Sequence, residues 1–343
     1  IRIGSPDPAH VLVIQRDSPT SGWKVEAINS GRSPIGGVEP DLDRIVRDAV
    51  LGGTLSASHD IGQAADADVI LVCVQTDRAG NAPDYGPLYS ALDGLADALG
   101  KGPPRDQPPL VIIESTLAPS SMTTVIRERF AAHGLTEGTD VLLGNSPNRV
   151  MPGRLVERIA ESDKLVAGLD PRTPRLIERL YAHIVTRGEL LPTSSLTAEI
   201  VKTLENAYRD VRIAFTAEIA RYCDAHDLDF YSVRRQVNER IRQADRANED
   251  PDSVPSGGLL VPTLGVGGHC LPKDGILLWW RRRETDGDTG GSLILKARTI
   301  NDESPGNTLD LAERRFGDYR TGKVALLGVA YRLNSEDTRN SPT

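Results

Sequence analysis

The sequence contains no apolar run that approaches the ~20 residues needed to cross a membrane as a helix, and we expect no secretory signal. Cysteine is scarce. Cys73, Cys223 and Cys270 are odd in number and far apart, which excludes a disulfide framework and a Cys-X-X-Cys zinc site. These absences predict a protein of the reducing cytoplasm that has neither a membrane partner nor a bound metal.

Positive charge is also limited. The 40 lysines and arginines are outnumbered by 48 acidic residues, and the net charge is -8. This balance argues against a nucleic-acid binder, although it allows local arginine clusters for an anionic ligand. A hydrophobic share of 39% over 343 residues describes an ordinary globular chain, long enough for two domains or a domain and a half.

Apolar strands alternate with helical patterns in the first half of the chain. Val69–Val74 is a continuous apolar run, typical of a parallel strand buried on both faces. Further strands are predicted at Val11–Ile14, Leu110–Ile113 and Val141–Leu143, and helices at Trp23–Asn29, Leu88–Leu99 and Ser120–Ala132. This alternation predicts an α/β fold with a doubly wound, Rossmann-like dinucleotide-binding domain over residues 1–192, in which the first βα unit is incomplete.

Polar residues follow three of these strands. Gln75-Thr76 ends one strand, Glu114–Thr116 a second and Asn145–Arg149 a third. Each group could be an ordinary turn or helix cap. Because ligands bind at the carboxyl ends of strands in open α/β sheets, three such groups in succession favour a cofactor cleft.

Thr193–Asp227 is the longest helical pattern and opens a central helical domain over residues 193–318. Lys202, Asn206 and Arg209 share one face of this helix. That face could simply be solvated, but an asparagine inside a helix is usually placed for a hydrogen bond. Since a helix of this length exceeds one small lobe, we expect it to connect two lobes or to pair two subunits in a homodimer.

Lys323–Val329 predicts a new buried strand and the beginning of a second Rossmann-like domain over residues 319–343. Because a single strand cannot bury itself, we expect this sequence to be a fragment of a longer protein.

The stretch Gly265–Asp274, Gly-Val-Gly-Gly-His-Cys-Leu-Pro-Lys-Asp, concentrates the chemistry of the chain. Its glycines allow positive φ and close approach of a ligand. Cys270 stands just before a helix whose first turn holds Pro272, where the helix dipole favours a nucleophilic thiolate. Lys273 could strengthen that effect, and Asp274 offers a carboxylate one turn away. The alternative is an inert buried cysteine beside a glycine-rich turn.

The ten-residue stretch resembles the catalytic-cysteine loop of the UDP-glucose/GDP-mannose dehydrogenase family, the nucleotide-sugar 6-dehydrogenases. The resemblance extends over nearly the whole chain and looks closest to the branch acting on UDP-N-acetylhexosamines. The other matching motifs are Val72–Thr76, Glu114–Thr116, Ser146-Pro147, Ala198–Lys202 with Asn206, Ala297–Asn301, Leu327–Arg332 and Asp337–Arg339.

The resemblance implies NAD-dependent four-electron oxidation of the C6 hydroxyl of a UDP-sugar, UDP-ManNAc or UDP-GlcNAc, to the uronic acid, for surface polysaccharide precursors. It implies that Cys270 forms a thiohemiacetal and then a thioester. Lys202 and Asn206 would stabilise oxyanions, and Asp274 and Thr116 would position water and proton transfers. The implied cofactor contacts are Gln15, Arg16, Val74, Gln75, Thr76, Thr116 and Arg339. The implied substrate contacts are Asn148, Arg149, Lys202, Asn206, Arg209, Gly265, Gly267, Gly268, Tyr331 and Arg332.

The chain departs from the family pattern at three places. The glycine fingerprint of the first dinucleotide turn is missing. Gln15 stands where an acidic residue would bind a ribose hydroxyl, and the following Arg16 suits a 2′-phosphate, so NADP stays open beside NAD. Asn148 replaces a glutamate linked to water activation, for which Glu161 or a water held by Asp274 could substitute. The alternatives are a UDP-glucose 6-dehydrogenase, a two-electron alcohol dehydrogenase and a non-catalytic nucleotide-sugar-binding relative.

Overall fold

The computed structural model describes residues 9–247, 257–287, 290–332 and 335–343. The chain divides into two compact units, Ile1–Thr203 with Arg332–Glu336, and Leu204–Tyr331 with Asp337–Thr343. Each unit is described by itself. The domain boundaries inferred from the sequence, after residues 192 and 318, stay a prediction.

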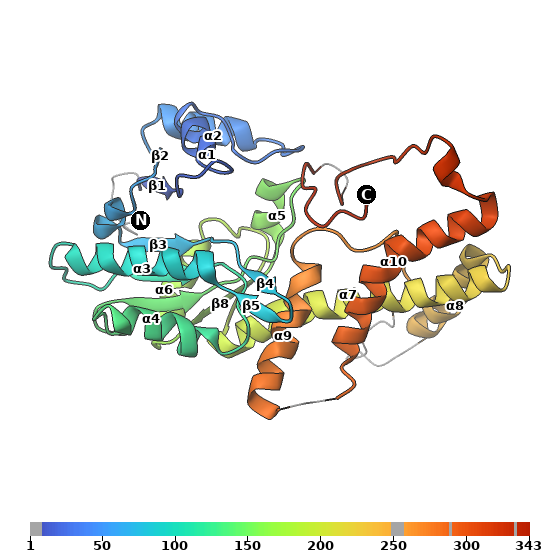
Figure 1. The fold of residues 1–343 in the computed structure, drawn as a ribbon. Coiled ribbons are helices and arrows are strands. Elements are labelled where there is room, and N and C mark those ends of the chain that lie inside the picture. Colours follow the sequence, from blue (N-terminus) through green and yellow to red (C-terminus); the bar gives the residue numbers. More distant parts are fainter. Residues whose placement is uncertain (1–8, 248–256, 288–289, 333–334) are drawn as a thin grey trace. The chain divides into compact units, whose positions relative to one another are not determined.

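The first unit is built on a five-stranded sheet with the order β3-β6-β7-β8-β9. Two of its strands, β3 and β8, are labelled in Figure 1. Its strands are β3 (Val69–Val72), β6 (Leu110–Ile113), β7 (Leu142–Asn145), β8 (Lys164–Gly168) and β9 (Leu190–Ser194). Neighbouring strands run parallel except at β7 and β8, which pair antiparallel. The predicted α/β sheet is therefore confirmed, with one antiparallel pair that the sequence pattern did not predict.

Helices cover both faces of this sheet. Val111 and Ile113 of β6 lie in one apolar cluster with residues of α3 (Gly86–Lys101) and α4 (Arg127–Ala132). Leu110 and Ile112 lie in a second cluster with residues of α6 (Thr173–Tyr181). Because successive side chains of a strand point to opposite faces, the continuous apolar run of β6 reflects burial on both sides.

Smaller elements surround the main sheet. β1 (Val11–Ile14) and β2 (Leu55–Ser58) form a parallel pair of their own, and β4 (Asp77–Ala79) pairs antiparallel with β5 (Ala82–Asp84). The remaining elements of this unit are α1 (Trp23–Asn29), α2 (Leu42–Leu51), η1 (Ile61–Asp66), the π-helical turn η2 (Met122–Ile126) and α5 (Leu155–Glu161). The predicted helix at Ser120–Ala132 is thus a π turn followed by α4.

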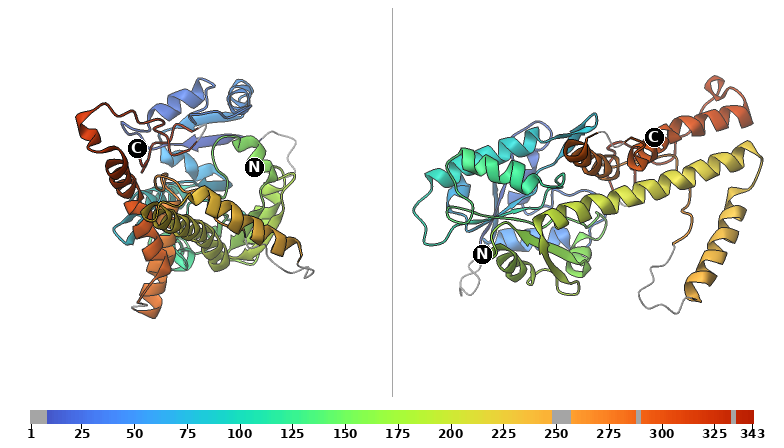
Figure 2. Two further views of the ribbon diagram at one scale, coloured as in Figure 1. Left: turned by 90° about the vertical axis from the view of Figure 1, so that its right-hand side faces the viewer. Right: turned by 90° about the horizontal axis from the view of Figure 1, so that it is seen from below.

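The second unit is helical. The long helix predicted at Thr193–Asp227 is confirmed as α7 (Ser195–Ala225), which Figure 2 shows as one continuous helix. It is followed by α8 (Phe230–Arg246), α9 (Leu271–Asp286), α10 (Leu293–Phe316) and the short η3 (Tyr319–Thr321). Asp229 caps α8 by accepting hydrogen bonds from the backbone N–H groups of Tyr231 and Ser232.

A buried ion pair ties α7 to α10. The Arg298 guanidinium donates to Asp210 at 2.6 Å, and the Asn301 amide donates to the same carboxylate oxygen at 2.9 Å. Burial raises the pKa of Asp210 to about 6, although Arg298 opposes this shift. Arg298 and Asn301 belong to the motif Ala297–Asn301, which the sequence analysis noted without a role. Their role in the structure is to hold the two helices together.

The predicted buried strand at Lys323–Val329 is wrong for this structure. These residues form no strand, and their apolar side chains are exposed, with Leu327 95% accessible. The physical reason is the absence of a pairing partner among the described residues, since an unpaired strand leaves its backbone groups to solvent.

Candidate active site

The Cys270 thiol is exposed at the start of α9. Its own carbonyl accepts hydrogen bonds from the N–H groups of Lys273 at 3.1 Å and Asp274 at 2.8 Å, which closes the first turn of the helix. Pro272 lies in this turn, where the missing N–H costs nothing. The thiol therefore stands at the positive end of a 16-residue helix and is open to a reactant.

The glycines before Cys270 are packed against the C-terminal segment of the same unit. A Cβ on Gly267 would lie 2.5 Å from the Cβ of Tyr331, and one on Gly268 would lie 2.9 Å from the Tyr331 ring. Gly268 also has φ +81 and donates its N–H to the Arg339 carbonyl at 2.8 Å. The chain itself thus approaches these glycines closely, which places Tyr331 and Arg339 beside the cysteine loop; the contact of the glycines with a substrate stays a prediction.

Arg339 lies close enough to Cys270 for their charges to interact. Hydrogen bonds to Asp337 are the main reason why the pKa of Arg339 is raised, and the negative charge of the Cys270 thiolate adds to this shift. A guanidinium beside the sulfur stabilises the thiolate form. Arg339, predicted as a cofactor contact, therefore lies within electrostatic range of the candidate nucleophile, while its guanidinium is bound to Asp337.

Asn206 and Asp274, both predicted as catalytic, are in contact. The Asn206 amide donates to Asp274 Oδ2 at 2.6 Å, and Lys273 Nζ lies 3.1 Å from Asp274 Oδ1. Asp274 is fully buried and Lys273 is 3% exposed. The Lys273 ammonium group thus forms an ion pair with Asp274, and its predicted effect on Cys270 stays a prediction. The carboxylate in turn fixes the orientation of the Asn206 amide.

In the first unit, the polar ends of β3 and β6 are joined. Thr76 is buried and donates to the Thr116 carbonyl at 2.8 Å, and Ser115 donates to the Val74 carbonyl at 2.6 Å. The predicted cofactor residues Val74, Gln75, Thr76 and Thr116 therefore lie on one edge of the sheet. This edge fits a dinucleotide, since open α/β sheets bind such ligands at the carboxyl ends of their strands.

Gln15 and Arg16 lie at the end of another sheet. They follow β1, and the Gln15 N–H donates to the Ser58 carbonyl at 3.0 Å, which continues the β1–β2 ladder. The Gln15 amide donates to Ser21 at 3.1 Å, and Arg16 is exposed. The structure thus leaves these two residues on the separate two-stranded sheet and does not place them on the edge formed by β3 and β6.

Lys202 and Arg209 differ in their surroundings on α7. Lys202 is only 8% exposed, whereas Arg209 is exposed. The alternative interpretation of Lys202 as a solvated surface residue is therefore wrong. Lys202 and Arg332 belong to the first unit. Arg209 and Tyr331 belong to the second unit.

The turn after β7 carries Asn148 and Arg149. Asn148 is exposed, and its N–H donates to the Glu114 carbonyl at 3.3 Å, which joins this turn to the end of β6. Glu161, considered as a substitute for the missing glutamate, forms an ion pair with Arg187 at 2.9 Å. Glu199 belongs to the motif Ala198–Lys202, which the sequence analysis noted without a role for this residue; it is a buried carboxylate on α7 that accepts the N–H groups of Ser120 and Met122.

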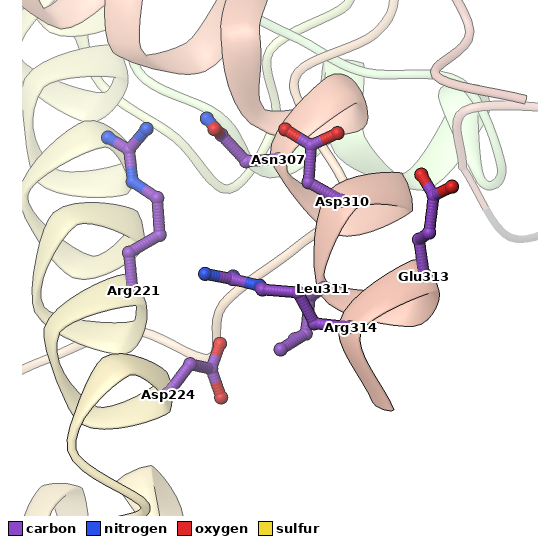
Figure 3. A pocket seen from close by; sticks show the side chains of 7 residues that line it. All are labelled: Arg221, Asp224, Asn307, Asp310, Leu311, Glu313 and Arg314. Atoms are coloured by element: carbon purple, nitrogen blue, oxygen red, sulfur yellow. The ribbon is translucent and has the colours of Figure 1, made fainter. Parts of the chain in front are cut away.

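A depression of about 550 Å³ lies between α7 and α10 (Figure 3). It is lined by Arg221, Asp224, Asn307, Asp310, Leu311, Glu313 and Arg314. It shares no residue with the cysteine loop, so it is not part of the candidate site. No cluster of possible metal ligands occurs in the described parts of the chain, and none of their helices is long and apolar enough to cross a membrane.

The α/β sheet, with polar residues joined at the carboxyl ends of β3 and β6, defines the class of dinucleotide-dependent dehydrogenases. Residues 9–185 match the model of the UDP-glucose/GDP-mannose dehydrogenase family NAD binding domain, and residues 196–303 match the central domain of the same family. The chain belongs to this family, which confirms the resemblance inferred from its motifs. It is an oxidoreductase, and its cofactor is NAD.

Two curated relatives are each 32% identical to this chain in sequence. Each alignment covers 93% of this chain and 70% of the relative. They are the UDP-N-acetyl-D-mannosamine dehydrogenase of Pyrococcus horikoshii and the NDP-N-acetyl-D-galactosaminuronic acid dehydrogenase of Ralstonia nicotianae. The solved structure of the UDP-D-ManNAc dehydrogenase of Pyrococcus horikoshii superposes with a TM-score of 0.79 at 31% identity, over 97% of this chain and 73% of that one.

Proposed function

We propose that the enzyme oxidises the C6 hydroxyl of a UDP-N-acetylhexosamine, UDP-ManNAc or UDP-GlcNAc, to the uronic acid, as a precursor of surface polysaccharide. The observation that carries this proposal is the exposed Cys270 thiol at the start of α9, in a glycine loop on which the segment with Tyr331 and Arg339 packs. The similarity to relatives named for UDP-N-acetyl-D-mannosamine and an NDP-N-acetylhexosaminuronic acid supports the sugar class.

The residues at the ends of β3 and β6 would hold NAD, which accepts one hydride in each of the two oxidations. In the first, the C6 hydroxyl loses a hydride and a proton to become an aldehyde. Lys202 and Asn206 stabilise negative charge on this oxygen, and Thr116 helps to remove the proton. Asp274 acts through Asn206, whose amide it holds at 2.6 Å.

In the second oxidation, the Cys270 sulfur bonds to the aldehyde carbon, and the oxygen takes up a proton to give a thiohemiacetal. Loss of a hydride and a proton from this adduct gives a thioester. Water then adds to the thioester carbon, the carbon–sulfur bond breaks, and the carboxylate leaves while the thiolate is restored. The Arg339 charge favours the thiolate at both the attack and the release.

The stoichiometry of NADH formation tests this function. We expect two NADH for each UDP-ManNAc or UDP-GlcNAc consumed, because oxidation of the alcohol to the acid removes four electrons and each NAD accepts two. One NADH would identify a simple alcohol dehydrogenase, and none a nucleotide-sugar binder. UDP-glucose in a parallel assay tests the alternative sugar, and faster turnover of UDP-glucose would contradict the proposed substrate class.

We further propose that the enzyme is a homodimer formed through α7. Tyr208, Phe215 and Tyr222 recur at intervals of seven residues on this helix and are 55–60% exposed. Aromatic side chains aligned on one helix face are a common basis of isologous helix pairing.

We also propose that the enzyme works in the reducing cytoplasm, because all three cysteines are free thiols.

We expect Phe215→Asp to weaken dimerisation at least about thirtyfold, the loss typical of a central aromatic side chain at an interface. Sedimentation at micromolar concentration would show the wild type as a dimer and this variant shifted toward the monomer. Ile184→Asp, at an exposed position of the first unit, is the control and should leave the dimer intact. An active wild-type monomer would contradict the proposal.

A further inference from the structure

The Ser146–Leu155 segment leads from the end of β7 to the first residue of α5 and carries Asn148 and Arg149. Asn148 Oδ1 accepts the N–H of Val150 at 3.0 Å, so the group that Asn148 can offer a ligand is its NH₂ donor. Asn148 is exposed and Arg149 is half-buried, so both can meet a substrate. The position of the two ends of the segment therefore decides where these side chains stand.

The near end of the segment is held by a buried polar network. Lys164 Nζ lies 3.0 Å from Glu114 Oε1 and donates to the Ser146 carbonyl at 3.2 Å. The Glu114 side chain, 10% exposed, also accepts the hydroxyl of Tyr181, and its carbonyl accepts the Asn148 N–H. Lys164 thus holds Ser146 in place, and Glu114 holds Asn148 in place.

The far end is held by one carboxylate from a distant part of the chain. Glu39, in the loop between α1 and α2, accepts the backbone N–H groups of Gly153, Arg154 at 2.8 Å and Leu155 at 2.7 Å. Three consecutive N–H groups that converge on one anion form a backbone nest. Glu39 is 114 residues from the nearest of them in sequence.

The backbone at this end adopts a conformation that needs support. Gly153 has φ 93, and Arg154, which is not a glycine, has φ 135. A non-glycine residue persists in this region only where its surroundings hold it. Burial by itself would raise the pKa of Glu39. The three N–H groups and nearby Arg158 outweigh this effect, so that the pKa of Glu39 lies below its ordinary value. The carboxylate is therefore charged at neutral pH and accepts all three bonds.

We propose that Glu39 is a positioning residue that holds the far end of the Ser146–Leu155 segment, so that Asn148 and Arg149 meet the sugar nucleotide. The inference rests on the proposed function, because it assigns the substrate to this segment. Glu39 does not touch the reacting atoms. It acts through the three backbone N–H groups that it accepts, and no other described carboxylate is bound to them.

Hydrogen exchange and ligand binding test this role together. In Glu39→Gln, we expect amide exchange in peptides covering residues 150–156 to become at least about tenfold faster, because a neutral amide replaces a charged acceptor. The Kd for the UDP-sugar should rise about tenfold, while the Kd for NAD stays unchanged. Glu39→Asp keeps the charge and should recover part of both effects. Glu26→Gln, an exposed carboxylate on α1, is the matched control and should change neither.

Unchanged exchange in Glu39→Gln would overturn the anchoring role. Faster exchange with an unchanged Kd for the UDP-sugar would overturn the link between this segment and the substrate. A wild-type enzyme that oxidises none of the sugar nucleotides would contradict the proposed function, whereas the exchange measurement would still confirm or refute the anchoring by Glu39.

Discussion

Replacing Cys270 with serine is expected to abolish formation of the uronic acid and to leave binding of the sugar nucleotide nearly intact. At neutral pH an alkoxide is far scarcer than a thiolate, even at a helix N-terminus and beside Arg339. The rate of acid formation should fall by several orders of magnitude, as for other covalent nucleophiles. Single-turnover kinetics with mass analysis of the protein would show the loss of the covalent adduct.

Cys73→Ser is the matched control for this experiment. Although the Cys73 side chain reaches the surface, desolvation by its surroundings, followed by the charge of Glu114, raises the pKa of its thiol to about 11. This thiol is protonated at neutral pH and is a poor nucleophile, so its loss should leave acid formation unchanged. Acid formation at the wild-type rate in Cys270→Ser would refute the covalent mechanism.

Replacing Lys202 with alanine is expected to lower kcat by roughly 10²–10³ with little change in substrate affinity, the usual loss for one oxyanion donor. Lys202 lies on α7 four residues before Asn206 and is 8% exposed, so its charge is little screened by solvent. Lys202→Arg should recover only part of the rate, because a planar guanidinium replaces a point charge poorly. Pre-steady-state measurement of hydride transfer gives the rate of the step concerned.

Lys101→Ala provides the comparison, because Lys101 is exposed at the end of α3. A surface substitution of this kind should change the free energy of unfolding by no more than about 0.5 kcal/mol and leave kcat unaltered. If the burst rate of Lys202→Ala equals that of the wild type while its stability falls, Lys202 is a structural residue. That outcome would remove it from the proposed mechanism.

Local patterns identified most of the elements that carry the candidate site. The apolar run of β6 predicted the bounds of that strand without error. The run Val69–Val74, predicted to be buried on both faces, is a strand only over Val69–Val72, and Leu71 is 45% exposed. The helical pattern at Thr193–Asp227 was also sufficient to predict α7, since apolar side chains recur with the helical period over nearly nine turns. At Lys323–Val329 the same reasoning failed, because a strand also requires a partner that its own residues do not specify.

Contacts between distant residues were beyond such patterns. Asp274 and Asn206 were each singled out, but nothing in their spacing of 68 residues indicated that one holds the other. Lys273 was considered only as a neighbour of Cys270, and its ion pair with Asp274 was not predicted. Nothing in the sequence around Glu39 distinguishes it from a solvated acid, which is the usual state of an acidic residue beside a proline in a loop.

The sequence by itself determined the family and the α/β class and proposed the nucleophile, because these depend on residue types at short spacing: a glycine-rich loop, a cysteine and a proline at a helix start. Only the tertiary structure decided which groups hold the candidate site in place, namely Asp274 for Asn206, Tyr331 for the glycine loop and Glu39 for the Ser146–Leu155 segment. The physical reason is that hydrogen bonds and close packing join whatever groups the fold brings within about 3 Å, at any separation along the chain.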